Sequence, residues 1–72
     1  MDEKTKVVEF VSFCIEMYAR QTGMSGAVVT ELFETHGLLD YLFDNYKALH
    51  TQGKEYIIPL LQDFISKKEV SA

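Results

Sequence analysis

The amino-acid sequence predicts an all-α fold, a compact bundle of four helices in one small domain that spans residues 1–72. Three observations lead to this prediction. Apolar residues recur with helical period along most of the chain. Hydrophobic residues make up 47% of the chain, within the range of ordinary globular domains. Gly23, Gly37 and Gly53 each follow an apolar run, and each is predicted to end a helix with a positive φ.

The first helix is predicted over residues 3–21. Wound as a helix, this segment has one narrow polar stripe, formed by Thr5, Glu9, Ser12, Glu16 and Arg20. Apolar side chains occupy most of the remaining surface: Val7, Val8, Phe10, Val11, Cys14, Ile15, Met17 and Tyr18. So wide an apolar arc exceeds what the other short helices can cover, and a domain of this size has a marginal core. We therefore expect part of this surface to be buried against a partner.

The second helix is predicted over residues 26–35. Ser25 precedes it and suits the N-cap position, because a serine hydroxyl accepts a hydrogen bond from a backbone N–H of the first turn. Gly37 is expected to end this helix in the left-handed conformation. The expected buried face consists of Val28, Val29, Leu32 and Phe33. Local signals therefore define both ends.

The third helix is predicted over residues 39–51. Its core side consists of Leu38, Leu42, Tyr46 and Leu49, with Leu39 and Phe43 alongside. His50, Thr51 and Gln52 form the expected last turn, and Gly53 the expected cap.

Pro59 decides the prediction for the last element. Proline lacks an amide proton and disfavours a helical conformation in the residue before it, so the fourth helix is predicted over residues 59–68, with Pro59 as its first residue. Residues 54–58 are then a short extended link.

The charge and cysteine content limit the classes of partner. Eleven acids against seven bases give a net charge of −4, which attracts neither the phosphates of nucleic acid nor an anionic membrane. The single cysteine, Cys14, cannot form an internal disulfide, which is typical of a reducing compartment. Acidic residues interrupt the first apolar run, so the sequence predicts neither a secretion signal nor a membrane span. We expect a cytoplasmic protein.

No residue pattern predicts catalysis, a metal site or a cofactor. Cys14 lies between apolar neighbours, where burial raises the pKa of a thiol and leaves it inert. His36 and His50 fall near helix ends, and neither has a nucleophile or further ligands at a supporting spacing. The sequence contains no glycine-rich phosphate loop, HExxH or GxSxG motif. The sequence therefore predicts no enzyme, and it leaves a small-molecule ligand open.

The aromatic residues favour a protein-binding role. Most of them occupy core positions of the predicted helices, but four tyrosines have a polar end that can face a partner. We expect a homo-oligomer or a complex with another protein, with a contact surface near Tyr41, Tyr46, His50, Gln52 and Tyr56.

The alternative is a helix-turn-helix DNA-binding regulator, in which residues 39–51 would be the recognition helix. Asp40 and Asp44 on its outward face would repel phosphates, so this alternative is disfavoured.

Three segments together resemble one known family: VVEFVSFCIEMYA, MSGAVVTELFETHGLLDYLFDNYKALHTQG and KEYIIPLLQDFI. The most specific parts are SG-x-x-V-x-x-LF at Ser25 to Phe33, G-x-x-DYL at Gly37 to Leu42 and LHTQG-x-x-YI at Leu49 to Ile57. Over residues 6–65 the chain is similar to the bacterial domain of unknown function 3791 family.

The resemblance implies no catalytic residues, because the family has no established activity. It implies a short cytoplasmic protein, and a neighbourhood of genes resembling ADP-ribosyltransferase toxins that would suit an antitoxin or accessory partner. Pro59 stands where the family pattern favours an acid, a departure that agrees with the predicted break before it.

Overall fold

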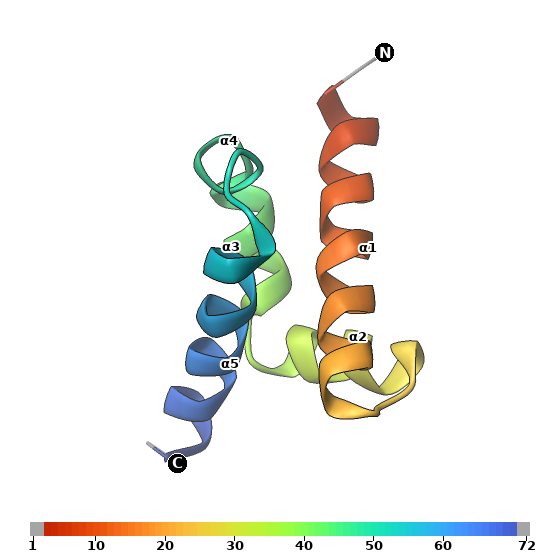
Figure 1. Cartoon of the computed structure of the whole chain (residues 1–72), viewed down its shortest axis with the longest axis vertical. Helices are drawn as coiled ribbons and strands as arrows, with labels where there is room; N and C mark the ends of the chain where they lie inside the picture. The colour runs from red at the N-terminus through yellow and green to blue at the C-terminus, as the bar shows by residue number, and fades with distance from the viewer. Residues whose placement is uncertain (1–2, 71–72) are drawn as a thin grey trace.

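The computed structural model describes residues 3–70, with side chains described up to residue 66. Its helices are α1 (Glu3–Thr22), α2 (Gly26–Thr35), α3 (Leu38–Asp44), α4 (Tyr46–Leu49) and α5 (Lys54–Val70). The long helices α1 and α5 lie on opposite sides of the molecule, and α2 crosses near the C-terminal end of α1 (Figure 1). The short α4 lies toward the other end, near the first turns of α1 (Figure 1). The described residues contain no strand, so the predicted all-α class is confirmed.

One apolar core joins all five helices. α1 packs against α2, α3 and α5, and α3 packs against α5 as well. The buried apolar residues are Val11, Cys14, Met17, Tyr18, Val29, Phe33, Leu38, Leu42, Leu49, Ile57, Leu61 and Ile65. The predicted core face of the second helix is only half right, because Val29 and Phe33 are buried whereas Val28 is 50% exposed.

The ends of α2 follow the local sequence signals. The Ser25 hydroxyl accepts a hydrogen bond from the Val28 backbone N–H, with an oxygen–nitrogen distance of 3.2 Å. At the other end Gly37 has φ +75°, and its N–H donates to the Glu34 carbonyl oxygen at 3.2 Å. Glycine adopts this left-handed conformation without the steric cost that a Cβ would bring. Both predicted ends are therefore confirmed.

The prediction of one helix over residues 39–51 was wrong. Asn45 separates α3 from α4, with φ −110° and ψ 19°. Its side-chain amide donates to the Tyr41 carbonyl oxygen at 2.9 Å, while its backbone carbonyl accepts from Ala48 and Leu49. Asparagine side chains compete in this way with helical hydrogen bonds, so one residue ends α3 and starts α4. The predicted last helical turn at residues 50–52 is a turn outside α4.

The predicted extended link over residues 54–58 was also wrong, because α5 begins at Lys54 and contains Pro59. Gly53 does not cap the preceding helix with a positive φ; instead its carbonyl oxygen accepts the Tyr56 and Ile57 N–H groups of α5. Proline inside a helix costs about 3 kcal/mol. Continuing the helix puts Ile57 in register with Leu61 and Ile65 on the buried face. Burying an isoleucine is worth about 1.5–3 kcal/mol, enough to offset most of that cost.

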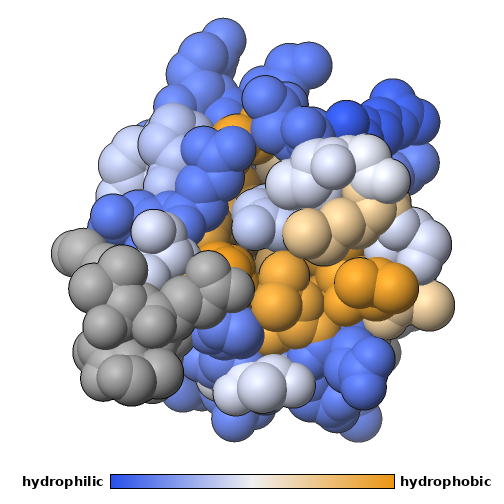
Figure 2. All heavy atoms as spheres, turned by 90° about the horizontal axis from the view of Figure 1, so that it is seen from below, coloured by the Kyte–Doolittle hydropathy of each residue, from blue (hydrophilic) through white to orange (hydrophobic). Residues whose placement is uncertain are grey.

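Apolar surface remains uncovered on several helices. Val8 and Phe13, from the wide apolar arc of α1, are 48% and 50% exposed. Figure 2 views the molecule from the end where α2 lies, and apolar residues gather in the middle of that face. The helices of this chain therefore leave part of their apolar surface to solvent.

Candidate protein-contact surface

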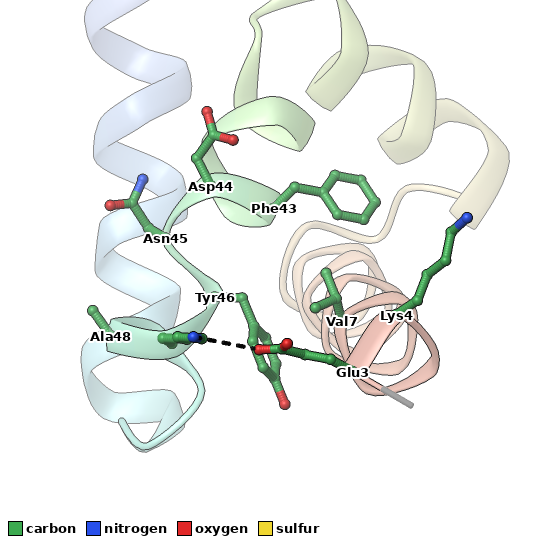
Figure 3. Close-up of a pocket in the computed structure, with 9 residues that line it drawn as sticks. Glu3, Lys4, Val7, Phe43, Asp44, Asn45, Tyr46 and Ala48 are labelled. Atoms are coloured by element: carbon green, nitrogen blue, oxygen red, sulfur yellow. Dashed lines mark ion pairs between the residues drawn. The ribbon is translucent and has the colours of Figure 1, made fainter. Parts of the chain in front are cut away.

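A groove runs between the first turns of α1 and the corner where α3 meets α4. Its volume is about 500 Å³. It is lined by Glu3, Lys4, Val7, Phe43, Asp44, Asn45, Tyr46, Lys47 and Ala48, and we call it the α1–α4 groove (Figure 3). The break at Asn45 creates this groove, because it turns α4 out of line with α3 and toward α1.

The floor of the α1–α4 groove is apolar and aromatic. Val7 and the Phe43 ring point into the space between α1 and α3 (Figure 3). The Tyr46 ring meets the Phe10 ring edge to face, with centroids 5.6 Å apart, and stacks on the His50 ring at 4.4 Å. These contacts hold Tyr46 in place. Phe43 is 45% exposed, so a large apolar side chain faces solvent at this floor.

Charged groups of both signs surround the floor. The Lys47 ammonium lies 3.8 Å from a Glu3 carboxylate oxygen, across the groove (Figure 3). Both side chains are mostly exposed, and such pairs contribute about 0–1 kcal/mol to stability. Lys4 and Asp44 lie at the outer margins and point away from the floor (Figure 3). Two acids and two bases therefore line the groove, so its rim has no net charge.

The structure brings together only two of the five residues predicted for a contact surface. Tyr46 and His50 both line a depression beside the α1–α4 groove, which they share with Glu3, Lys6 and Lys47. Tyr41 is half-buried elsewhere, with its ring 5.1 Å from the Phe64 ring. Gln52 is exposed in the turn between α4 and α5, and Tyr56 is exposed on α5. The predicted set therefore covers more than one surface.

Phe43 is the residue that the sequence reasoning missed. The helical pattern placed Phe43 beside Leu42 as part of the core, yet Leu42 is fully buried and Phe43 is 45% exposed. The available signal was its position at the edge of the apolar arc, beside Asp44, where the helical pattern leaves core and surface poorly separated. Val7 in α1 could not have been assigned, since its place in the groove depends on how α1 packs against α3.

The reactive side chains occupy structural positions. Cys14 is fully buried, and desolvation raises the pKa of its thiol from 9.0 to about 12, as the apolar neighbours predicted. The His36 Nδ1–H donates to the Leu32 carbonyl oxygen, and the His50 Nδ1–H donates to the Tyr46 carbonyl oxygen, both at 2.9 Å. Within residues 3–66, no three His, Cys, Asp or Glu side chains converge as metal ligands.

The helix that would be the recognition helix of a helix-turn-helix protein is shorter in the structure than the sequence predicted. α3 ends at Asp44, so the helix after the Gly37 turn has seven residues in place of the thirteen expected. Asp40 and Asp44 are both exposed on it.

No helix in the described part of the chain combines the length and apolar character needed to cross a bilayer.

The chain matches a known protein family. The model of the family described as Protein of unknown function (DUF3791) matches residues 9–68. The chain belongs to the DUF3791 family. This confirms the resemblance and covers nearly the same part of the chain. For this DUF3791 protein, no match was found among the curated proteins or the solved structures. Its function is therefore inferred from its own surface.

Proposed function

We propose that this DUF3791 protein is a protein-interaction module that pairs with a second copy of itself through the α1–α4 groove. The observation that carries this proposal is Phe43, which is nearly half exposed in the apolar floor of the groove, beside Val7 and Tyr46. Protein interfaces typically have an aromatic, apolar centre and a polar rim, and the α1–α4 groove has both.

The charge of the rim favours a second copy as the partner. A twofold axis places the same surface on both sides of an interface, so that surface must be complementary to itself. With Lys4 and Lys47 against Glu3 and Asp44, two copies can set bases of one against acids of the other. Other faces suit such pairing less well. Outside the groove the described acids outnumber the bases: Glu9, Glu16, Glu31, Glu34, Asp40, Glu55 and Asp63 against Lys6, Arg20 and Lys54.

The mass of the chain in solution tests this proposal. Size-exclusion chromatography with light scattering should give a dimer for the natural chain and a monomer for Phe43→Ser, because serine removes the apolar floor. Phe13→Ser is the matched control, since Phe13 is equally exposed but lies outside the groove. It should remain dimeric. Circular dichroism should show that both variants keep their helices.

Two results contradict the proposal. One is a natural chain that stays monomeric up to ~1 mM, where even a weak association of about 4 kcal/mol becomes visible. The other is a dimer that Phe43→Ser leaves intact, which places the interface on a different face. A further experiment makes Lys47→Glu and Glu3→Lys, first singly and then together. Either single variant should weaken the dimer, and the double variant should restore it, if these charges meet across the interface.

A further inference from the structure

His50 lines a depression that adjoins the α1–α4 groove. The other lining residues are Glu3 and Lys6 of α1 and Tyr46 and Lys47 of α4, and the volume is about 540 Å³. We call it the His50 depression. Glu3, Tyr46 and Lys47 line the groove as well, so the two hollows form one continuous surface. A second copy that covers the groove therefore comes close to His50.

The contacts of His50 determine which of its ring atoms can take up a proton. The His50 ring stacks on the Tyr46 ring, with the two planes 16° apart. The Tyr46 carbonyl oxygen can only accept a hydrogen bond, so the His50 Nδ1 atom, 2.9 Å away, carries a proton whether the ring is neutral or charged. Nε2 is therefore the atom that gains the second proton. Because His50 is exposed, Nε2 can exchange that proton with solvent in the unpaired chain.

The surface around His50 already has an excess of bases. The titratable groups that share its depression come from α1 and α4, and none of the described lining residues belongs to α5: Glu3, Lys6, Tyr46 and Lys47. The rim of the groove alone has no net charge, and Lys6 adds one base to it. In a pair of copies, the acids of each rim can match only the bases of the other rim. A positive charge on His50 would therefore meet no remaining acid.

We propose that protonation of His50 weakens the pairing of two copies through the α1–α4 groove, so that acidification separates the dimer. The proposal rests on the self-pairing proposed above. Histidine side chains gain their charge between about pH 8 and 5, a range in which ordinary carboxylates and lysines keep theirs. In each pair of copies the change adds two positive charges to a surface with an excess of bases. Covering these charges with the partner also removes the water that stabilises them, whereas a neutral imidazole has no such cost.

The dissociation constant of the dimer at two pH values tests this proposal. Sedimentation equilibrium of the natural chain at about pH 8 and about pH 5.5 should show the dissociation constant rising about 10-fold on acidification, which corresponds to about 1.4 kcal/mol. His50→Asn should abolish the rise, because asparagine stays neutral and its amide can still donate a hydrogen bond. His50→Lys introduces a permanent charge, so its dimer should be weak at both pH values. Circular dichroism at both pH values should show that the helices persist.

The other histidine of the chain provides the matched control. His36 has the same kind of local hydrogen bond, from Nδ1–H to the Leu32 carbonyl oxygen, but it lines neither the groove nor the His50 depression. His36→Asn should therefore keep the full response to pH. Lys6→Gln tests the electrostatic cause, since it removes a base beside His50 and leaves the lining of the groove intact. It should reduce the response from about 10-fold to about 3-fold, because each charged His50 then faces less repulsion.

Three results overturn the proposal: equal dissociation constants of the natural chain at both pH values, a response that His50→Asn retains, or a response that His36→Asn abolishes. A failure of the self-pairing itself gives a different result. A natural chain that is monomeric at about pH 8 up to ~1 mM contradicts both proposals. A dimer that Phe43→Ser separates and acidification leaves intact contradicts only the role of His50.

Discussion

The two turns at Gly37 and Gly53 look alike in the sequence and differ in the structure. Each glycine follows an apolar helical run and precedes another. Gly37 has a positive φ and ends α2, as its local sequence predicts. The carbonyl oxygen of each glycine accepts a hydrogen bond from the helix that follows, but Gly53 has no positive φ. Gly37 therefore ends α2 in the left-handed conformation and also begins α3, whereas Gly53 only begins α5.

The difference shows which energies are local and which are not. At the two ends of α2, the Ser25 cap and the left-handed Gly37 each act on residues only a few positions away, so their effect is visible in the sequence. Around Gly53 the local signal is Pro59, which opposes a helix through residues 54–58. Burial of Ile57 against the rest of the core overrides it. Tertiary packing decides the second turn, whereas hydrogen bonding and backbone sterics decide the first.

The largest expected effect is the loss of the Ile57 side chain. Ile57→Ala should lower the free energy of unfolding by about 2–5 kcal/mol, because Ile57 is 1% exposed and its removal leaves a cavity. It should also unfold the first turn of α5, since Pro59 then has no opposing burial. Hydrogen exchange of the amides before Pro59 measures this local opening. Ile58→Ala is the control, as Ile58 is only half-buried; an equal loss in both variants would contradict our account.

The second prediction compares alanine substitutions at Gly37 and Gly53. Gly37→Ala should cost about 1–2 kcal/mol, because φ +75° places a Cβ near the following carbonyl oxygen. Gly53→Ala should stay within about 0.5 kcal/mol of the natural chain. Alanine is a poorer helix N-cap than glycine, which lowers the stability, but it also lowers the entropy of the unfolded chain, which raises the stability. The new Cβ would meet only the movable end of Glu55, at 2.8 Å. Chemical denaturation of both variants gives the difference, and equal costs would refute the assignment of Gly53.

A smaller effect of opposite sign is expected at Pro59. Pro59→Ala should raise the free energy of unfolding by about 1 kcal/mol. Alanine restores the donor for the Glu55 carbonyl oxygen and favours a helix, although it makes the unfolded chain more flexible and so offsets part of the gain. Thermal unfolding measures the change. A destabilised Pro59→Ala variant would mean that the proline ring is needed where it lies.

The buried Cys14 thiol reports on opening of the core. Burial raises the pKa of the folded thiol from 9.0 to about 12, so its thiolate fraction at pH 8 is far lower than in the unfolded chain. Labelling by a disulfide reagent should therefore require opening of the core. Ile57→Ala should accelerate it far more than Gly53→Ala does.

The same pKa predicts a dependence of stability on pH. A raised pKa in the folded state means that this contribution is complete below pH 9 and is lost as the pH rises toward 12. Cys14→Ala should flatten the corresponding part of the stability profile. For the labelling experiment, rapid labelling of the natural chain at pH 8 would contradict our prediction, because the thiol would then be accessible without opening of the core.

The candidate site was less predictable than the fold, and particular residues show why. Tyr46 and His50 were identified because a tyrosine and a histidine near a helix end can face a partner, and both lie beside the α1–α4 groove. Phe43 was not identified, because the helical pattern separates core from surface only to within one position. Tyr41 and Phe64 come from helices distant in the sequence, so their ring contact could not be foreseen.

The sequence by itself determined the all-α class, the two ends of α2 and the buried position of Cys14. These features depend on helical periodicity and on hydrogen bonds between near neighbours, which the order of residues specifies directly. Only the tertiary structure decided the continuation of α5 through Pro59 and the exposure of Phe43. In α5 a local preference of a few kcal/mol against the helix is offset by burial of Ile57, and that burial exists only once the helices have packed. The exposure of Phe43 likewise depends on where the neighbouring helices lie.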